Sequence, residues 1–388
     1  MVLFFMRIAI IGCGFVADYY LKALTAYPEL KITGVMDIDK ERAKRFAAFY
    51  RLAIYQTMEE LLADTRVDLV LNLTNPHSHY SVSHACLEAG KHVYSEKPLA
   101  MVFSEAEQLV LLAEQKSLYI TSAPCSLLGE TAQTIWRALR QNAIGSVRLV
   151  YAEMDDGLIH RMRYNKWTTD SGAPWPYKDE FEVGCTIEHA GYYLTWLTAF
   201  FGPAKSVTSF ARCLIPNKLT PVPLNVISPD FTLASIEFAS GVVARLTCSI
   251  IAPHDHSLRI FGDEGVLSIN ECWNYRSPVN IKYRTKLSLW AEKYHFLSLL
   301  PGIAAKKLPL VRKKNTGDGY KGTDQMDFGR GVAEMANAIS EMRPCRMSAK
   351  HALHVNELTL AIQYPEKMGC PRTLISSFGE LEPMPWAL

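Results

Sequence analysis

The residues with the clearest chemical potential form a short glycine motif near the amino terminus. Gly12, Gly14 and Ala17 fit the pattern G-x-G-x-x-A, with Phe15 and Val16 between the last two. A glycine at the first position allows a tight turn from strand to helix, and one at the second lets the backbone approach a pyrophosphate. The following helix would present unpaired N–H groups and a positive dipole end to the phosphates. The motif therefore predicts that these residues, Gly12, Gly14, Phe15 and Val16, bind a dinucleotide.

An acidic residue, Asp37, lies about 20 residues after this motif, where the next strand is expected to end. A carboxylate there can accept hydrogen bonds from both hydroxyls of an adenosine ribose, and its charge would repel a 2′-phosphate. Positions 37 to 39 hold no arginine, and Arg42 follows one helical turn later. We therefore expect NAD as the cofactor, with NADP less favoured. Asp39 is expected to cap the following helix.

The elements that must position this site alternate along the first part of the chain. Strands are expected at 7–11, 31–36, 53–55, 67–73, 92–94 and 118–122. Helical segments are expected between them, at 15–26, 40–50, 58–63, 79–88 and from 104 onward. This alternation is typical of a parallel sheet covered on both faces. An α/β fold follows, with residues 1–123 as a doubly wound Rossmann domain.

The remainder of the chain, residues 124–388, has a different pattern. Strand-like runs occur at 146–154, 205–213, 231–238, 242–251, 257–261 and 266–269, and helices are expected at 130–142 and 188–201. Residues 275–325 are poorly periodic and are interpreted as an irregular insertion. We expect a C-terminal α+β domain built on a large, mostly antiparallel open sheet, which binds substrate and oligomerises. An uncovered apolar face of such a sheet favours a homodimer or homotetramer.

Composition excludes several classes of protein. The 388 residues are 49% hydrophobic, which is enough for packed cores. Lys and Arg total 41 against 39 Asp and Glu, so no basic excess suggests a nucleic-acid partner. No run approaches the roughly 20 apolar residues that span a bilayer. The nine cysteines contain no C-x-x-C pair, so neither a disulfide framework nor a zinc site is expected, and a cytoplasmic location is favoured.

Two further segments carry a family resemblance. T-N-P-H-S-H at 74–79 and A-G-K-H-V-Y-S-E-K-P at 89–98, combined with the glycine motif, closely resemble the glucose–fructose oxidoreductase / inositol dehydrogenase (Gfo/Idh/MocA) family. The resemblance is strong from residue 7 to about 125. It is looser at 144–147 and at the 262–265 turn. It implies an NAD(P)-dependent oxidoreductase acting on the hydroxyl groups of sugars, cyclitols or related polyols.

The resemblance also implies roles for individual residues. It makes Lys97 a catalytic or substrate-hydroxyl-binding residue beside the nicotinamide, and it places Glu96 at the nicotinamide end. Thr74, Asn75, Pro76 and His79 would flank the cofactor. Pro98 would follow a cis peptide bond, which X–Pro sequences permit. A lysine beside an oxidised nicotinamide also has reason to show a lowered pKa, so that Lys97 could share the hydroxyl proton.

The sequence departs from the family pattern D-x-G-x-H, in which the histidine acts as acid/base. The best register is His189-Ala190-Gly191-Tyr192-Tyr193, with His189 in the aspartate position and Tyr193 in the histidine position. Both are expected to face one cleft, as residues i and i+4 of a helix. A histidine with an ordinary pKa near ~6.5 suits a base better than a phenol near ~10. The sequence leaves the choice between them open.

Several polar residues in the second half are weaker candidates. Glu188 could orient substrate. Arg163 and Trp167 belong to a polar, aromatic segment at 160–178 that could recognise a sugar or an anionic group. The pairs at 254/256 and 351/354 are histidines with no third metal ligand suggested by spacing. We interpret them as histidines satisfied by polar partners, and no metal site is predicted.

The leading hypothesis is an NAD-dependent oxidoreductase that moves hydride between nicotinamide and a hydroxyl-bearing carbon of a sugar or polyol. Lys97, with His189 or Tyr193, would handle the proton. One alternative is a relative that oxidises transiently in order to eliminate or hydrolyse a glycosidic bond. Another is a non-catalytic protein that senses NAD or sugar, which the altered D-x-G-x-H motif favours and the retained Lys97 disfavours.

Overall fold

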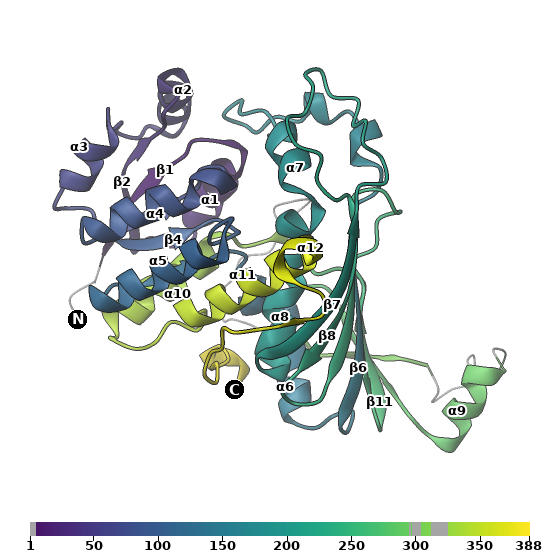
Figure 1. The fold of residues 1–388 in the computed structure, drawn as a ribbon. Helices are drawn as coiled ribbons and strands as arrows, with labels where there is room; N and C mark the ends of the chain where they lie inside the picture. The colour runs from purple at the N-terminus through teal and green to yellow at the C-terminus, as the bar shows by residue number, and fades with distance from the viewer. Residues whose placement is uncertain (1–4, 295, 297–303, 312–324) are drawn as a thin grey trace.

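Two sheets organise the chain in the computed structural model, which describes residues 5–294, 296, 304–311 and 325–388 (Figure 1). The first sheet has five parallel strands in the order β2-β1-β3-β4-β5. Its strands are β1 Met6–Ile11, β2 Leu30–Met36, β3 Leu69–Asn72, β4 His92–Ser95 and β5 Ile120–Ser122. Its helices are α1 Phe15–Leu24, α2 Lys40–Tyr50, α3 Met58–Ala63, α4 His79–Glu88 and α5 Phe103–Gln115. The predicted Rossmann fold is confirmed.

One expected strand of this domain is reduced to a single bridge. Residues 53–55 contribute only an isolated parallel bridge between Ile54 and Val35, so the sheet has five strands rather than six. Strands β1 and β3 are almost wholly buried, as their continuous apolar runs predict for a sheet covered on both faces, whereas the edge strand β2 is only partly buried.

The second sheet has nine strands in the order β13-β12-β11-β10-β6-β9-β8-β7-β14. They are β6 Val147–Asp155, β7 Ala204–Arg212, β8 Phe231–Phe238, β9 Val243–Ser249, β10 Leu258–Gly262, β11 Gly265–Ile269, β12 Val279–Tyr283, β13 Lys306–Leu308 and β14 Arg372–Thr373. Only β6 and β9 pair in parallel. The segment at 275–325 is more regular than expected, because β12, α9 (Lys286–Lys293) and β13 lie within it. The expected irregular insertion also includes residues 295, 297–303 and 312–324, which lie outside the described residues.

Helices cover one face of this sheet and leave the other open (Figure 1). The covering helices include α6 Glu130–Arg140, α8 Gly191–Phe201 and α11 Ala349–Gln363. Along β8, buried and more exposed residues alternate, as expected for a half-buried strand. Leu233 of β8 and Phe210 of β7 are exposed.

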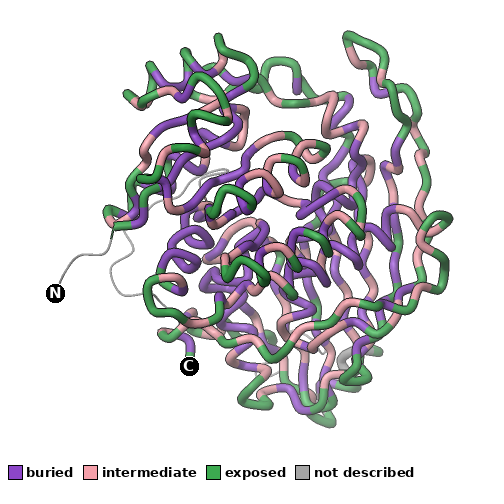
Figure 2. The backbone as a smooth tube through the Cα atoms, turned by 60° about the vertical axis from the view of Figure 1, so that its left-hand side comes forward, coloured by how far each residue is buried: buried purple, intermediate pink, exposed green. Residues whose placement is uncertain are grey.

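The C-terminal helices join the two domains. Residues of α10 (Gly329–Ser340) pack into the same core as β1 and α1, so this part of the chain returns to the Rossmann domain. Helix α11 contacts α5 on one side and α8 and β7 on the other. Figure 2 shows buried backbone running through both sheets and the helices between them. The domain boundary between residues 123 and 124 stays a prediction. Helix α10, although it lies far beyond that boundary, packs with the first domain. Among the described residues, no helix has the length and apolar character needed to span a membrane.

Candidate active site

The glycine motif forms the turn between β1 and α1, at the carboxyl edge of the parallel sheet. Gly12 has a φ of +98°, and a Cβ there would lie 2.4 Å from the carbonyl oxygen of Leu73. Gly14 is the N-cap of α1, and a Cβ there would meet nothing within 4 Å. Phe15 and Val16 begin the helix and are half-buried. The helix N-terminus therefore opens onto free space beside glycine backbone, which fits a dinucleotide pyrophosphate.

Asp37 directly follows β2 and turns its carboxylate toward the glycine motif. Its oxygens accept hydrogen bonds from the N–H groups of Cys13 and Asp39, each at 2.8 Å. Asp39 caps α2 as predicted, accepting from the N–H groups of Glu41 and Arg42. The Arg42 guanidinium lies 3.6 Å from Asp37. The carboxylate is thus fixed where an adenosine ribose is expected, with one cation beside it.

The loop after β3 is tied to the turn after β4 by His79. Its Nδ1 lies 2.6 Å from the carbonyl oxygen of Pro98, and its Nε2 lies 3.1 Å from that of Thr74. Burial lowers the pKa of His79 to about 4, so the ring is neutral and donates to one carbonyl. The Asn75 side chain accepts the Ser78 N–H at the 3₁₀ turn Pro76–Ser78. His79 is therefore a positioning residue of the loop that carries Thr74, Asn75 and Pro76.

Glu96 and Lys97 follow β4 at the same edge of the sheet. One Glu96 oxygen accepts from the Tyr20 hydroxyl at 2.7 Å, and the other accepts from the Lys97 N–H at 3.1 Å. The bond between Lys97 and Pro98 is cis, as the resemblance implies. The Lys97 ammonium donates a hydrogen bond to the Glu188 carboxylate, so the two domains meet at this ion pair.

Glu188 and His189 lie on a π-helix, Thr186–Ala190, that runs directly into α8. Such local widening is frequent at functional sites. His189 Nδ1 lies 3.1 Å from the Asp156 carboxylate, and its Nε2 lies 3.2 Å from that of Glu180. Sequence reasoning missed both carboxylates. Asp156 follows the end of β6 and Glu180 lies on α7 (Tyr177–Val183), so no local spacing links them to His189.

The charges around Lys97 overturn one expectation. Burial by itself would lower the pKa of Lys97, but the carboxylates of Glu188, Glu180 and Glu96 outweigh it and raise that pKa. The expected lowered pKa is therefore wrong for this structure. The raised pKa favours the ammonium form of Lys97, which donates hydrogen bonds. A proton that leaves it needs an acceptor, and the nearby carboxylates are the candidates.

Glu188 and His189 have charge states suited to opposite roles. Burial raises the pKa of Glu188 to about 7, although Lys97 favours the carboxylate. Burial opposes the charged form of His189, but Asp156 and Glu180 together raise its pKa to about 9. The raised pKa favours the protonated form of His189 at neutral pH, and its role as acid/base stays a prediction. Glu188 is the group that can gain or lose a proton near neutrality.

Tyr193 does not take the place that the motif assigned to it. Its side chain is fully buried in the core of the C-terminal domain, and its hydroxyl donates to the backbone carbonyl of His256. Its neighbour Tyr192 instead lines a cavity together with Glu96 and Lys97. Glu188, four residues before Tyr192, contacts Lys97, so this face of the helix carries Glu188 and Tyr192, and the expectation that Tyr193 faces the cleft is wrong.

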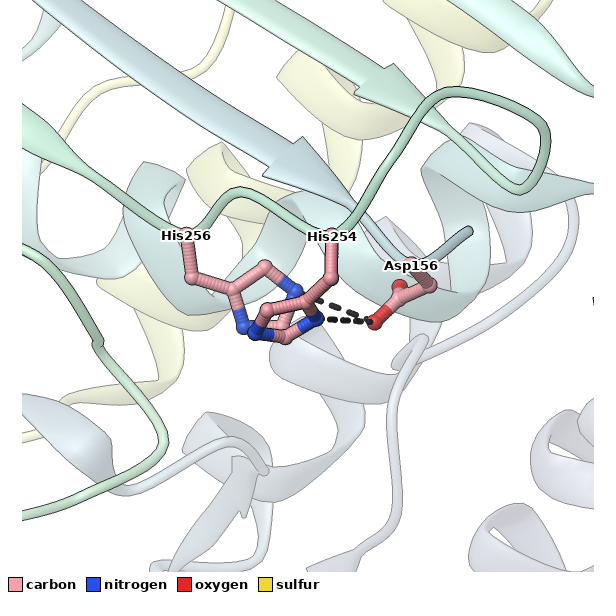
Figure 3. Close-up of side chains that lie close together, drawn as sticks. All are labelled: Asp156, His254 and His256. Atoms are coloured by element: carbon pink, nitrogen blue, oxygen red, sulfur yellow. Dashed lines mark hydrogen bonds and ion pairs between the residues drawn. The ribbon is translucent and has the colours of Figure 1, made fainter. Parts of the chain in front are cut away.

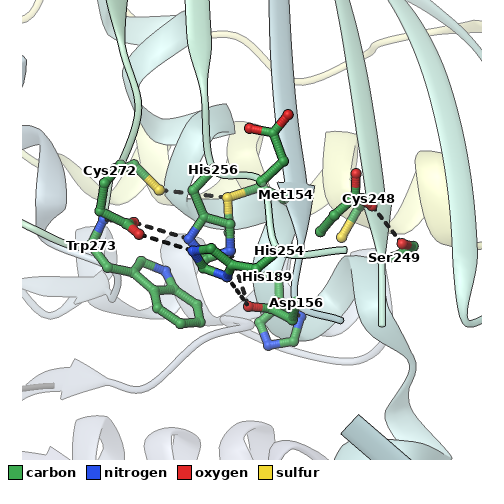
Figure 4. Close-up of polar contacts among 12 residues, drawn as sticks. Met154, Asp156, His189, Cys248, Ser249, His254, His256, Cys272 and Trp273 are labelled. Carbon is green, nitrogen blue, oxygen red and sulfur yellow. Dashed lines mark hydrogen bonds and ion pairs between the residues drawn. The ribbon is translucent and has the colours of Figure 1, made fainter. Parts of the chain in front are cut away.

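Asp156 also faces the histidine pair of the β9–β10 connection (Figure 3). Its Oδ1 lies 3.0 Å from His256 Nε2 and 4.0 Å from His254 Nδ1. Glu271 bonds the other nitrogen of each ring, at 3.0 Å and 3.2 Å. The predicted polar partners are thus present, but they are carboxylates from distant segments. Figure 4 shows Asp156 between His189 on one side and this pair on the other.

The second histidine pair is satisfied in the way the sequence predicted. His351 Nε2 lies 2.8 Å from the Thr198 hydroxyl. His354 Nε2 accepts the Ala204 N–H at 2.9 Å, and its Nδ1 lies 3.0 Å from Ser376. These histidines hold α11 against α8 and β7.

The segment at 160–178 crosses to the Rossmann domain. Arg163 and Trp167 are exposed, so they are free to meet a ligand. Thr169 and Ser171 donate hydrogen bonds from their hydroxyls to the buried Asp18 carboxylate, at 2.8 Å and 2.6 Å. Because Asp18 lies in the first turn of α1, this segment is fastened beside the glycine motif. The roles of Arg163 and Trp167 in substrate recognition stay predictions.

Comparison with protein families gives two matches along the chain. Residues 6–123 match a family model described as an oxidoreductase family with an NAD-binding Rossmann fold. Residues 132–268 match the GFO/IDH/MocA C-terminal domain. The two matches cover the sheets and helices that carry Lys97, Glu188 and His189.

Individual relatives are distant but cover most of the chain. The trans-1,2-dihydrobenzene-1,2-diol dehydrogenase of Mus musculus is 24% identical over 273 residues, which is 69% of this chain and 75% of the mouse protein. The WlbA dehydrogenase from Bordetella pertussis, solved with NADH and UDP-GlcNAcA, superposes with a TM-score of 0.71 at 15% identity, covering 95% of this chain and 98% of that one. The 3-ketoreductase KijD10 from Actinomadura kijaniata, solved with NADP, gives 0.69 at 20% identity, covering 92% and 96%. These two structures share the fold of this chain.

Proposed function

This chain belongs to the Gfo/Idh/MocA family of NAD(P)-binding oxidoreductases, and we propose that it transfers hydride between nicotinamide and a hydroxyl-bearing carbon of a sugar derivative. The observation that supports this most is the convergence of Lys97, Glu188 and His189 at the carboxyl edge of the strands that also carry the glycine motif. Ligands bind at this edge in open parallel sheets. The sugar class is supported by the solved WlbA dehydrogenase, whose complex contains UDP-GlcNAcA.

The residues of the chain divide the proton chemistry among them. The cofactor would supply the hydride acceptor, carbon C4 of its nicotinamide. The Lys97 ammonium would hold the substrate hydroxyl and relay its proton to the Glu188 carboxylate as the C–H bond breaks. His189, protonated between Asp156 and Glu180, would hold these two carboxylates in place beside the substrate, because its two ring nitrogens face them. Tyr192, which lines the Lys97 cavity, would contact the sugar ring.

The reaction is tested by a substrate panel. The full chain, supplied with NAD or NADP, is incubated with polyols, sugars and sugar nucleotides, and reduced nicotinamide is followed by absorbance. The reverse direction uses the reduced cofactor and keto sugars. We expect turnover with at least one hydroxyl-bearing sugar derivative. A cofactor-binding protein that reduces and oxidises none of these compounds would contradict the proposal.

The cofactor preference is a separate proposal, namely NAD over NADP, and it rests on Asp37. We expect Asp37→Ser to weaken NAD binding by about tenfold, or 1.4 kcal/mol, because the ribose loses its charged acceptor. NADP binding should improve, since the repelling charge is gone while Arg42 remains. Dissociation constants for both cofactors measure the change. Asp39→Ser is the matched control, since it keeps a capping residue on α2 and should leave the ratio of the two constants unaltered.

The pH dependence of oxidation should follow Glu188. Its pKa of about 7 means that the carboxylate, the form that accepts a proton, is lost as the pH falls through neutrality. We therefore expect kcat/KM for alcohol oxidation to rise with pH up to about 7 and then to level off. Glu188→Gln should remove this rise and lower the plateau, while Glu182→Gln, on the preceding helix α7, should retain the wild-type profile. A wild-type rise that survives in Glu188→Gln would assign the proton to another group.

Oligomeric state and location complete the proposal. The open face of the nine-stranded sheet exposes apolar side chains, including Phe210 and Leu233, and we propose that a second copy of the chain covers it. All nine cysteines are free thiols, which supports a reducing compartment such as the cytoplasm.

A further inference from the structure

Three side chains of the types that bind metal ions lie close together where β6 ends and β10 begins. None of them contacts Lys97 directly. Asp156, His254 and His256 each place one possible ligand atom within 4.8 Å of those of the other two (Figure 3). Bond lengths of about 2.0–2.1 Å place neighbouring donors of a tetrahedral zinc ion roughly 3.4 Å apart. The observed separations from Asp156, 3.0 Å to His256 and 4.0 Å to His254, lie on either side of this value. Small side-chain movements would bring the three donors around one ion.

Glu271 orients both imidazole rings. Its two oxygens bond His256 Nδ1 and His254 Nε2. The remaining nitrogen of each ring is turned toward Asp156 (Figure 3). A carboxylate that bonds the distal nitrogen of a ligating histidine is a regular feature of metal sites, because it fixes the ring and increases its basicity. One glutamate does this for both rings here. The ring nitrogens that do not bond Glu271 both face Asp156, so possible donors of both histidines converge on one carboxylate.

The distance between His254 and Asp156, and the exposure of His254 to solvent, are also compatible with a bound metal ion. At 4.0 Å, His254 Nδ1 is too far from Asp156 for a hydrogen bond but close enough for both to reach a shared ion. Asp156 and His256 are buried, whereas 55% of the His254 side chain is exposed, which gives an ion a route from solvent. The two carboxylates that face the histidines, Asp156 and Glu271, together match the charge of a divalent cation.

We propose that Asp156, His254 and His256 bind a divalent transition-metal ion, with Glu271 as the residue that positions both histidines. Two imidazoles and one carboxylate favour Zn²⁺ and its neighbours over Mg²⁺ or Ca²⁺, which prefer oxygen donors. The remaining position would hold water or an oxygen of a bound ligand. Lys97 and Glu188 are not among the donors of this site, but Asp156 also faces His189 and so connects it with the proposed active site.

Metal binding to the chelator-treated full chain tests the proposal. Zn²⁺ affinity is measured by competition with a chromophoric chelator, and Co²⁺ is added separately to record its visible absorption. We expect one ion per chain and the visible bands of tetrahedral or five-coordinate Co²⁺. His254→Ala should weaken Zn²⁺ binding by at least about 100-fold, and Glu271→Gln by about 10- to 100-fold. Circular dichroism shows whether each variant is folded. Because the His254 side chain is exposed, we expect His254→Ala to disturb the fold less than a substitution at a buried ligand.

Two control variants remove similar groups that do not face the site. Asp255→Asn changes the exposed carboxylate between the two histidines, and His84→Ala removes a histidine of α4; both should bind Zn²⁺ like the wild type. The proposal is overturned if the wild type binds less than one ion, or if His254→Ala binds as tightly as these controls. A thiolate-to-cobalt band in the near ultraviolet would also overturn it, because it would move the ion to the alternative donors His256, Glu271 and Cys272.

Discussion

Replacing Lys97 by methionine will lower kcat by a factor on the order of 10²–10⁴ while leaving cofactor affinity close to that of the wild type. Methionine retains most of the length of the side chain but removes the ammonium that donates to Glu188. The substrate hydroxyl then loses both its hydrogen-bond donor and its route to a proton acceptor. The loss should appear in kcat and in kcat/KM, because the interaction is strongest while the proton moves.

The measurement uses the sugar derivative found in the panel, with cofactor binding followed by fluorescence of the reduced nicotinamide. Lys44→Met on α2 is the matched control, since Lys44 is an exposed lysine paired with Glu41, and it should have wild-type turnover. Thermal unfolding of both variants shows whether the fold is retained. Turnover near the wild-type rate in folded Lys97→Met would remove the proposed mechanism.

The two glycines of the cofactor turn should respond to the same substitution in different ways. Gly14→Ala adds a Cβ that meets nothing within 4 Å, so the stability of the cofactor-free protein should be unchanged. Cofactor affinity should fall by about 10- to 100-fold, or 1.4 to 2.8 kcal/mol, because the methyl group occupies space that the pyrophosphate needs. Gly12→Ala places a Cβ 2.4 Å from a backbone oxygen at a φ of +98°.

Gly12→Ala should therefore destabilise the protein even without cofactor, by about 1–3 kcal/mol or more. Denaturant unfolding of the cofactor-free chains separates the two effects, and titration with NAD measures the affinities. Gly90→Ala is a useful control, because Gly90 also has positive φ (+77°) but has no atom within 4 Å of its Cβ position. If Gly14→Ala bound NAD like the wild type, the dinucleotide would have to lie elsewhere than at this turn.

Local patterns were sufficient to predict most of the elements. Helix α2 and helix α4 have the residue limits that were expected, because their boundaries depend on nearby capping groups and on short-range periodicity. The same holds for the buried strands of the Rossmann sheet. The expected strand at 53–55 reached only one bridge, since pairing depends on a neighbouring strand that the local sequence does not specify.

Short sequence motifs were enough to predict the Rossmann turn, the Asp37 carboxylate and the position of Lys97, because each lies within a few residues of a strand end and the parallel sheet brings those ends to one edge. The chemical roles of Lys97 and His189 depend instead on how the chain folds around them. Their pKa values depend on burial and on carboxylates from distant segments, namely Glu188, Glu180 and Asp156. Likewise, Tyr192 and not Tyr193 lies at the cavity, since the motif does not specify which face of α8 packs into the core of the C-terminal domain.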